Sequence, residues 1–156
     1  MTDNLARKPA PAEPLLLGNQ LCFAVYSTAH AFNRVYKPLL DQLGLTYPQY
    51  LVMLVLWERD DVAVKEIGER LFLDSGTLTP LLKRLEAAGL IKRTRSKQDE
   101  RQVLIALTAD GVALREKAKM LPEAILAASA CSIAELSAMR TDLVALRDRL
   151  LAISGE

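Results

Sequence analysis

The chain has 156 residues, of which 51% are hydrophobic and 25% are charged. That length fits a single domain with its own core, and the composition excludes both a disordered chain and a membrane protein. The longest apolar run, residues 51–57, is far shorter than the ~20 residues of a membrane-spanning helix. Residues 1–14 hold three prolines and no apolar targeting segment, so we expect a flexible tail there and a cytoplasmic location.

Cysteine and histidine are too sparse for a metal site or a disulfide framework. The two cysteines lie 109 positions apart, and the single histidine, His30, has no partner at ligand spacing, so we expect no metal. The sequence also lacks Gly-x-Gly, Walker-type and His-Glu-x-x-His motifs. We therefore expect neither a cofactor nor an enzyme.

Positive charge is concentrated in one segment. The whole chain has a net charge of only +1 and a pI near 7.8, which argues weakly against a nucleic-acid partner. Residues 83–101, however, hold seven basic and three acidic side chains. Because phosphate contacts are made by a local patch and not by the average charge, this segment favours DNA as a partner.

The first third of the chain predicts two helices. Apolar residues recur every three or four positions over residues 21–39, which indicates a long helix with Asn19 as its N-cap and Gly44 as its end. Pro38 should kink or end the last turn of this helix. A second helix, over about residues 46–58, opens with a Thr-x-x-Gln capping box and is apolar nearly all round, so it should be central.

The middle of the chain predicts a helix-turn-helix. A short helix over residues 64–71 precedes a break and a second helix, which residues 74–77 can cap and which ends at Gly89. Pro80 cannot donate a backbone hydrogen bond. The second helix therefore either starts late, with Thr79 as its N-cap, or is irregular in its second turn.

A basic hairpin is predicted directly after the helix-turn-helix. Residues 90–95 and 103–107 have the composition of two strands, and the polar residues 96–101 can form the loop between them. Four cations fall within six residues, at Lys92, Arg93, Arg95 and Lys97. A helix-turn-helix followed by such a hairpin is a winged helix.

Two further helices are predicted at the end of the chain. One starts at Thr108 and should bend at Pro122. The last starts at Ser132 in a Ser-x-x-Glu capping box, and its apolar stripe repeats every three or four residues as far as Leu150. Since the winged helix supplies its own core, long terminal helices need something to bury against, and a twin chain is the simplest candidate.

The predicted fold is mainly α with a small β-wing. A winged helix-turn-helix over residues 46–108 is flanked by N- and C-terminal helical dimerisation regions, residues 15–45 and 109–153, in one intertwined domain. A homodimer also suits double-stranded DNA, because paired recognition helices meet successive major grooves about one turn apart on a pseudo-palindromic operator.

Motifs in the second half of the chain resemble those of a known family. They are DSGTLTPLLKRLEAAGLI at residues 74–91, DER at 99–101 and LTADG at 107–111. The sequence thereby resembles the MarR family of dimeric winged-helix regulators, over about residues 15–153. Within that family, the OhrR-type repressors, which sense organic hydroperoxides, are resembled by NQLCFAVY at residues 19–26, VYKP at 35–38 and LTYPQY at 45–50. A second cysteine, Cys131, resembles the two-cysteine branch of the OhrR type.

The resemblance implies how the chain would bind operator DNA. The helix from Ser75 would enter the major groove, with base and phosphate contacts from Ser75, Thr77, Thr79, Pro80, Lys83 and Arg84. Arg101 in the wing would insert into the minor groove, with Asp99 orienting its guanidinium and further cations at Arg95 and Lys97. A capped surface helix and a solvated run of charges are the plain alternative for the same residues.

Cys22 is the candidate redox-sensing residue. A small buried hydrophobe is the plain alternative for a cysteine in a helix. With Asn19 as the N-cap, however, Cys22 occupies the third helical position, where free N–H groups and the helix dipole favour a thiolate. Nearby aromatic residues predict an apolar pocket that favours organic hydroperoxide over hydrogen peroxide: Phe23, Tyr26 and Phe32.

The OhrR resemblance implies that the Tyr36 and Tyr47 hydroxyls hydrogen-bond this thiolate. Tyr36 follows Cys22 by 14 positions, roughly 21 Å along a straight helix, so the contact would have to come from the other subunit. The resemblance further implies that oxidised Cys22 forms a disulfide with Cys131 of the partner subunit. An inert thiol is the alternative for Cys131.

The predicted function is therefore a dimeric transcriptional repressor that leaves its operator when organic hydroperoxide oxidises Cys22. Two alternatives stay open. One is a MarR-type repressor that a small phenolic ligand releases, with no redox role for the cysteines. The other, less favoured, is a thiol peroxidase, in which the basic segment of residues 83–101 would have no use.

Overall fold

The computed structural model describes residues 13–155 of the chain. The chain divides into two compact units, Met1–Arg34 and Val35–Glu156. Of the tail predicted over residues 1–14, only the last two positions belong to the described residues, and the rest of that prediction lies outside them.

In the first unit a short 3-10 helix, η1 (Leu17–Asn19), leads into α1 (Leu21–Leu43), whose residues from Val35 onward belong to the second unit. The N-cap prediction is wrong: Asn19 ends η1, and its side-chain amide donates to a carbonyl six residues earlier, at 2.8 Å. The carbonyl that accepts the first backbone hydrogen bond of α1 belongs to Gln20. Cys22 is therefore the second residue of α1, one position earlier than predicted.

Backbone capping sets the link between α1 and the next helix. α1 passes through Pro38 without ending there and stops at Gly44, whose φ of +67° suits a residue without a Cβ. The predicted capping box then starts α2 (Tyr47–Glu58). The Thr46 side chain accepts a hydrogen bond from the Gln49 backbone, and the Gln49 side chain accepts one from the Thr46 backbone at 2.9 Å.

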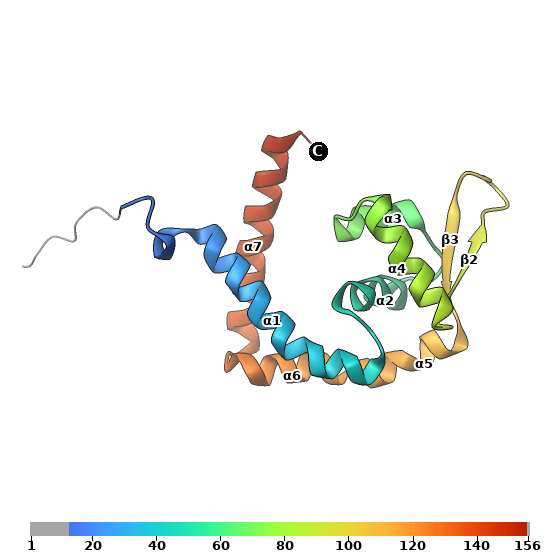
Figure 1. Ribbon diagram of the computed structural model, residues 1–156, viewed down its shortest axis with the longest axis horizontal. Helices are drawn as coiled ribbons and strands as arrows, with labels where there is room; N and C mark the ends of the chain where they lie inside the picture. The colour runs from blue at the N-terminus through green and yellow to red at the C-terminus, as the bar shows by residue number, and fades with distance from the viewer. Residues whose placement is uncertain (1–12, 156) are drawn as a thin grey trace, which may run out of the picture. The chain divides into compact units, whose positions relative to one another are not determined.

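Helix α2 is the centre of the second unit, as its apolar sequence predicts. It contacts α3 (Val64–Leu71), α4 (Ser75–Ala87) and α5 (Ala109–Ala118), and Figure 1 shows α2, α3 and α4 grouped beside the sheet. Val52 and Met53 of α2 are completely buried. They share one core with Ile67, Leu78, Leu82, Leu85, Ile91 and Ile105.

Helices α3 and α4 form the predicted helix-turn-helix. Gly68 in α3 lies so close to the turn that an added Cβ would be 2.8 Å from the Leu73 carbonyl oxygen. The turn itself bends at Phe72, which has a left-handed φ of +56°. This close approach requires a glycine in α3, because any side chain would push the turn away.

Helix α4 begins at Ser75, so of the two alternatives that Pro80 left open, the late start at Thr79 is wrong. The Asp74 carboxylate accepts a hydrogen bond from the Thr77 N–H at 2.7 Å, and this N-cap starts the helix ahead of Pro80. Pro80 lies in the second turn with its side chain exposed. Its missing N–H therefore costs one backbone hydrogen bond on the solvent side, which the cap and the buried face of α4 offset.

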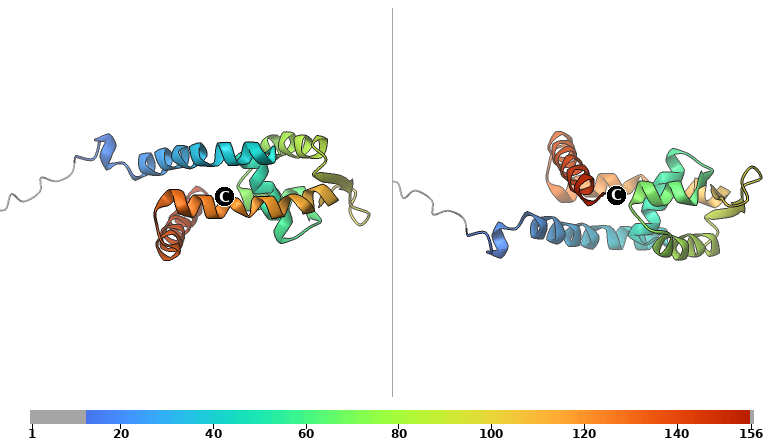
Figure 2. Two further views of the ribbon diagram at one scale, coloured as in Figure 1. Left: turned by 90° about the horizontal axis from the view of Figure 1, so that it is seen from below. Right: turned by 90° about the horizontal axis from the view of Figure 1, so that it is seen from above.

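The sheet has three strands, one more than predicted. β3 (Val103–Leu107) pairs antiparallel with β1 (Val62–Ala63) on one side and with β2 (Ile91–Arg95) on the other. β1 has only two residues, too few for an alternation of apolar and polar side chains to reveal it. β2, β3 and their loop form the wing, which projects from the helices of this unit in both views of Figure 2.

The helices after the wing differ from the prediction in one respect. α5 and α6 (Met120–Ser129) are separated at Lys119, three residues before Pro122, where a bend was expected. A proline ring clashes with the carbonyl four positions earlier, so the helix is interrupted ahead of the proline, and Pro122 fits the first turn of α6. α7 (Ile133–Ser154) starts in its predicted capping box, and none of its 22 residues is buried.

No single helix among the described residues, 13–155, is long and apolar enough to span a bilayer. Residues 109–129 and α7 reach the length and apolar composition of a span only when they are taken together, and the two are bent by 96° relative to each other.

The packing of α5 on the base of the wing gives a test of the fold. A Cβ added to Gly111 would lie 2.1 Å from the Leu90 carbonyl oxygen. We expect Gly111→Ala to lower the free energy of unfolding by about 2 kcal/mol, measured by urea denaturation. Gly18→Ala is the control, because no atom beyond those of its chain neighbours lies within 4 Å of a Cβ added there. An unchanged free energy of unfolding in Gly111→Ala would contradict this close packing.

Candidate functional site

Helix α4 separates an apolar face from a polar one. Leu78, Leu81, Leu82 and Leu85 are buried against the core. The residues predicted to contact DNA lie on the other side, where all are exposed except the half-buried Thr79: Ser75, Thr77, Thr79, Pro80, Lys83 and Arg84. The arrangement presents hydroxyls in the first turns of the helix and two cations further along, which suits base and phosphate contacts in a groove.

The wing loop is held in shape by its own hydrogen bonds. The buried Ser96 hydroxyl accepts from the backbone N–H groups of Gln98 and Asp99, at 3.2 and 3.3 Å. The Asp99 carboxylate accepts from the backbone N–H of Arg101 at 3.0 Å. Asp99 was expected to orient the Arg101 guanidinium, whereas the contact in the structure is to the Arg101 backbone. Asp99 therefore fixes where the Arg101 side chain starts.

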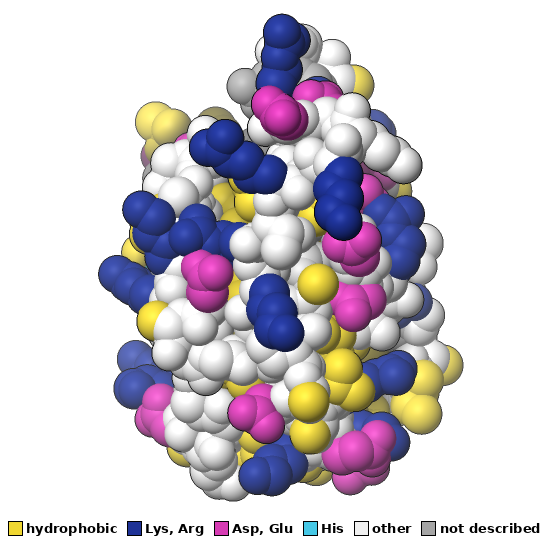
Figure 3. All heavy atoms as spheres, turned by 90° about the vertical axis from the view of Figure 1, so that its right-hand side faces the viewer, with side chains coloured by type: hydrophobic (Ala, Val, Ile, Leu, Met, Phe, Trp, Pro, Cys, Tyr) yellow, Lys and Arg dark blue, Asp and Glu magenta, His cyan; other side chains and the backbone are white. Residues whose placement is uncertain are grey.

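The cations of the wing differ in how free they are. Arg93 is held by Glu86 at 2.6 Å. Arg95, Lys97 and Arg101 are exposed, and none of them makes an ion pair with the described residues. Figure 3 shows lysine and arginine side chains spread over the face that carries the wing, with acidic side chains among them. Lys92 in β2 is also exposed and makes no ion pair with the described residues, so the wing offers four cations to phosphate.

In the first unit, Cys22 lies exposed in the first turn of α1. The aromatic residues predicted to surround it are exposed as well: Phe23 and Phe32 by 39% and Tyr26 by 61%. The N–H groups of a first helical turn lack intrahelical partners and form the positive end of the helix dipole, so such positions favour negative charge. This unit thus presents an accessible thiol on a helix that also exposes apolar side chains.

In the second unit, three tyrosines form one cluster. The ring centroid of Tyr36 lies 5.0 Å from that of Tyr47 and 6.0 Å from that of Tyr50. The Tyr47 and Tyr50 centroids are 6.3 Å apart. These separations are those of interacting aromatic rings. The two tyrosines that the sequence singled out are therefore neighbours, and Tyr50 joins them.

The environment of this cluster keeps its phenols protonated. Burial raises the pKa of Tyr36 to about 12, and the neighbouring Tyr47 and Tyr50 phenols add to the effect. Burial also raises the pKa of Tyr47 and of Tyr50. At neutral pH all three hydroxyls are therefore O–H donors, as hydrogen bonding to a thiolate requires.

Cys131 lies in the short link between α6 and α7 and is half-buried. Its thiol donates to the Ser129 carbonyl at 3.3 Å, and its backbone N–H donates to the Ser129 hydroxyl at 3.2 Å. Ala130, just before it, has a left-handed φ of +53°. Both Cys22 and Cys131 are free thiols in this structure, and their pairing between subunits stays a prediction.

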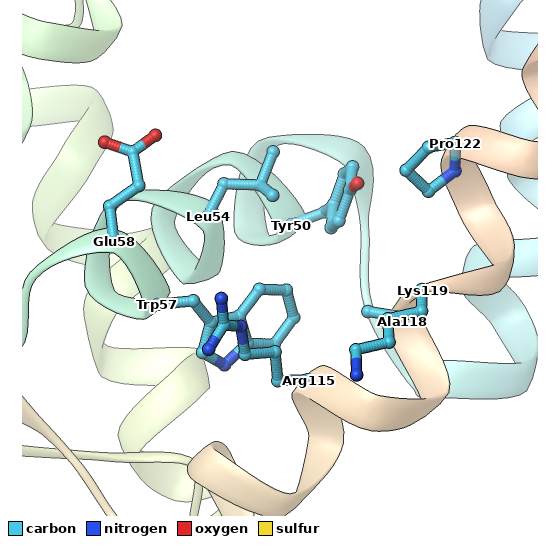
Figure 4. Close-up of a pocket in the computed structure, with 8 residues that line it drawn as sticks. All are labelled: Tyr50, Leu54, Trp57, Glu58, Arg115, Ala118, Lys119 and Pro122. Atoms are coloured by element: carbon cyan, nitrogen blue, oxygen red, sulfur yellow. The ribbon is translucent and has the colours of Figure 1, made fainter.

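A pocket of about 200 Å³ lies between α2 and the junction of α5 and α6 (Figure 4). Tyr50, Leu54 and Trp57 contribute ring and aliphatic surface from α2, and Pro122 faces them from α6. Arg115, Lys119, Ala118 and Glu58 complete the lining. Tyr50 thus belongs both to the tyrosine cluster and to the pocket, which is apolar with two cations and one carboxylate.

A helix-turn-helix with an exposed polar face on its second helix, followed by a basic wing, defines a winged-helix DNA-binding protein. Residues 34–118 match the family described as transcriptional regulator SarA/Rot. The HTH-type transcriptional regulator TtmR of Methylorubrum extorquens is 54% identical over 92% of this chain and 73% of its own length. The organic hydroperoxide resistance transcriptional regulator of Bacillus subtilis is 52% identical over 86% of this chain and 91% of its own length.

Solved structures of AbfR from Staphylococcus epidermidis are also similar. Reduced AbfR bound to DNA has a TM-score of 0.73 and 39% identity, over 88% of this chain and 94% of that one. Disulfide-formed AbfR has a TM-score of 0.60 and 42% identity, over 83% and 91%. The chain therefore belongs to the MarR family of winged-helix transcriptional regulators, and within it is similar to the OhrR type. The predicted resemblance and winged-helix fold are confirmed, whereas the boundaries of the dimerisation regions stay a prediction.

Three residues of these sites were not singled out from the sequence: Tyr50, Ser96 and Trp57. Tyr50 follows Tyr47 by three positions on one predicted helix, which places the two on one face, so this spacing could have revealed it. Ser96 opens the predicted hairpin loop three residues before Asp99, a spacing typical of serine-based turns. The indole of Trp57 donates a hydrogen bond to the carbonyl of Gly111, 54 positions away, and no local sequence pattern predicts such a contact.

The tyrosine cluster predicts a distinctive pH dependence. The phenol of Tyr36 should lose its proton at about pH 12, against an ordinary value of 10.0. Because the folded phenol titrates above the unfolded one, this group should leave the free energy of unfolding unchanged below pH 10 and lower it as the pH rises toward 12. Tyrosinate absorbance in the ultraviolet measures the titration directly. Tyr36→Phe should lose the part of the absorbance change that occurs above about pH 11. A variant that kept the wild-type titration curve there would contradict the raised pKa of Tyr36.

Proposed function

We propose that the chain is a dimeric transcriptional repressor that leaves a pseudo-palindromic operator when organic hydroperoxide oxidises Cys22. The observation that carries this proposal is an exposed thiol in the first turn of α1, in a chain 52% identical to an organic hydroperoxide resistance regulator. The protonated tyrosine cluster supports it, because the half-buried Tyr36 and the more exposed Tyr47 supply the hydrogen-bond donors that a thiolate needs. In this proposal no metal and no cofactor takes part, and the chain is not an enzyme.

Binding to DNA rests on α4 and the wing. The exposed face of α4 enters the major groove, where its N-terminal hydroxyls meet base edges and Lys83 and Arg84 hold phosphates. The wing reaches the adjacent minor groove, where Arg101 gains from the focused negative potential. AbfR, 39% identical to this chain, has been solved bound to DNA, which supports the same use of the fold here.

The homodimer rests on apolar surface that the single chain leaves uncovered. In α7, Ile133 is 73% and Leu150 is 57% exposed, and Met139 and Leu143 of the same stripe are exposed as well. Covering such a stripe contributes about 25 cal/mol per Å² of apolar area, and a second copy of the same helix is complementary by symmetry. The second copy would also bring Tyr36 and Tyr47 to the Cys22 of the other subunit, since 14 positions of one helix separate Tyr36 from its own Cys22.

The sensing chemistry has two steps. The Cys22 thiolate attacks the terminal oxygen of the hydroperoxide: an S–O bond forms, the O–O bond breaks, and the alkoxide takes a proton and leaves as an alcohol. Sulfur is oxidised by two electrons to a sulfenic acid, and the peroxide is reduced. The partner subunit's Cys131 thiolate then attacks the Cys22 sulfur, forming the disulfide and releasing the hydroxyl as water after protonation. A cellular dithiol restores both thiols.

Oxidation weakens operator binding through geometry. The Cα atoms of a disulfide lie within about 7 Å of each other, so closing the bond moves the helices that carry the two cysteines. The hydrogen bonds from Tyr36 and Tyr47 are lost with the thiolate. The movement of the helices turns the two wings out of register with successive grooves. A loss of only about 1.4 kcal/mol of binding free energy reduces the affinity for the operator tenfold.

The test is a gel shift on a pseudo-palindromic promoter fragment. Reduced protein should bind, a stoichiometric organic hydroperoxide should release it, and dithiothreitol should restore binding. A disulfide-linked dimer should accompany release on a non-reducing gel. Cys22→Ser should bind and ignore peroxide, whereas Cys131→Ser should be oxidised without forming the linked dimer. If peroxide released the Cys22→Ser protein from the promoter fragment, the proposed mechanism would be wrong.

A second candidate signal, a small phenolic ligand, is favoured by the pocket beside Tyr50. About 200 Å³ between apolar side chains and the cations Arg115 and Lys119 suits a small aromatic acid. This alternative predicts release from DNA that does not depend on either cysteine. Adding salicylate to Cys22→Ser in the same gel shift separates the two signals, because only the ligand mechanism survives in that variant.

The wing contact makes an independent prediction about affinity. Arg101→Ala should weaken operator binding by about 1–3 kcal/mol and reduce the dependence of affinity on salt. Lys117→Ala removes the same charge from an exposed position in α5, outside the wing, and is the matched control. Equal losses of affinity in the two variants, measured by fluorescence anisotropy, would show that only net charge matters.

A further inference from the structure

Tyr50 connects the tyrosine cluster to a second aromatic residue of α2. It is only 4% exposed, and its ring lies 6.0 Å from Tyr36 and 6.3 Å from Tyr47, centroid to centroid. On its other side it meets the Trp57 ring at 6.4 Å and 62°, an edge-on contact. Figure 4 shows Tyr50 and Trp57 directed from α2 toward the same pocket. The ring of Tyr50 therefore cannot shift without affecting the Tyr36–Tyr47 pair and Trp57.

Trp57 in turn is attached to the helix behind the wing. Its indole N–H donates to the Gly111 carbonyl, in the first turn of α5, at 2.9 Å. This is a contact between residues 54 positions apart in the chain. A rotation of the Trp57 ring must either break this hydrogen bond or carry the start of α5 with it.

The start of α5 is locked to the base of the wing. The Thr108 N–H donates to the Leu90 carbonyl at 3.0 Å, and the Thr108 hydroxyl donates to the Gly89 carbonyl at 2.6 Å. Gly111 lies so close to Leu90 that no side chain fits between them. Leu90 directly precedes β2, so the first turn of α5 and the root of the wing move as one body.

We propose that Tyr50 and Trp57 are positioning residues that transmit the state of the Tyr36–Tyr47 pair to the wing. This inference rests on the proposed redox function, in which oxidation of Cys22 removes the anion that the two hydroxyls hold. A close-packed aromatic cluster moves between discrete arrangements and does not deform continuously. When Tyr36 and Tyr47 reorient, Tyr50 follows, Trp57 turns, and its hydrogen bond to Gly111 displaces the root of the wing.

The chain contains a single tryptophan, so its fluorescence reports on this junction alone. An organic hydroperoxide should change the emission of the reduced wild-type protein, and dithiothreitol should reverse the change, which excludes damage to the indole itself. Cys22→Ser should give no change. Tyr50→Phe keeps the ring and should keep the signal, whereas Tyr50→Leu should lose it while Cys22 is still oxidised.

Operator affinity gives the second readout. The ratio of Kd for oxidised to Kd for reduced protein should fall at least threefold in Trp57→Phe, which keeps an aromatic ring but has no N–H for Gly111. Its reduced-state affinity and its rate of Cys22 oxidation should stay within twofold of wild type. Val112→Ala, an exposed neighbour of Gly111 in α5, is the control and should keep the wild-type ratio.

The outcomes separate the relay from the redox function beneath it. A wild-type ratio in both Trp57→Phe and Tyr50→Leu, with peroxide still releasing wild-type protein, would overturn the relay and leave the proposed function standing. A wild-type protein whose DNA binding ignores peroxide would overturn both. A reduced ratio in Trp57→Phe with normal oxidation of Cys22 supports the relay, because a merely structural defect would alter the reduced state as well.

Discussion

The structure of the second unit depends on the burial of α2. This helix is apolar nearly all round, and α3, α4, α5 and the sheet all pack on it. Its first turn carries Tyr47 and Tyr50, and its last carries Trp57. The same rigid element therefore supports the tyrosine cluster at one end and the wing at the other. Val52 and Met53, in the middle of α2, are completely buried. One end of α2 therefore cannot move relative to the other without disturbing the core.

The terminal helices have the opposite character. α7 is long and well capped, yet none of its residues is buried, and Met139, Leu143 and Leu150 of its apolar stripe are exposed in the single chain. In proteins, most of the stability of a helix comes from tertiary packing of its apolar face. In the proposed dimer, assembly would supply that packing, so folding of the terminal helices and association of the subunits would be coupled.

Features that depend on residues close together in the sequence could be predicted, whereas features that depend on distant residues could not. The starts of α2 and α7 were predictable because a capping box is a pattern of four residues, and α3 was predictable because its apolar spacing is local. Asn19 fits the same local rule for an N-cap, but a 3-10 turn ahead of α1 uses its side chain differently. β1 and the contact from Trp57 to Gly111 depend on segments distant in the chain. The paired roles proposed for Cys22, Tyr36 and Cys131 came from family resemblance, because in the proposal these residues meet across two chains.

The hydrogen bonds around Ser96 have a consequence for the speed and cost of recognition. A wing loop that had to order on DNA would lose about 1–2 kcal/mol of backbone conformational entropy per residue at the moment of binding. Here Ser96 and Asp99 hold the loop before DNA arrives, so that cost belongs to folding. In the proposed complex with DNA, only the side chain of Arg101 would then have to become ordered in the groove. A preorganised wing also behaves as a lever, because a small displacement at its root carries the whole tip away from the groove.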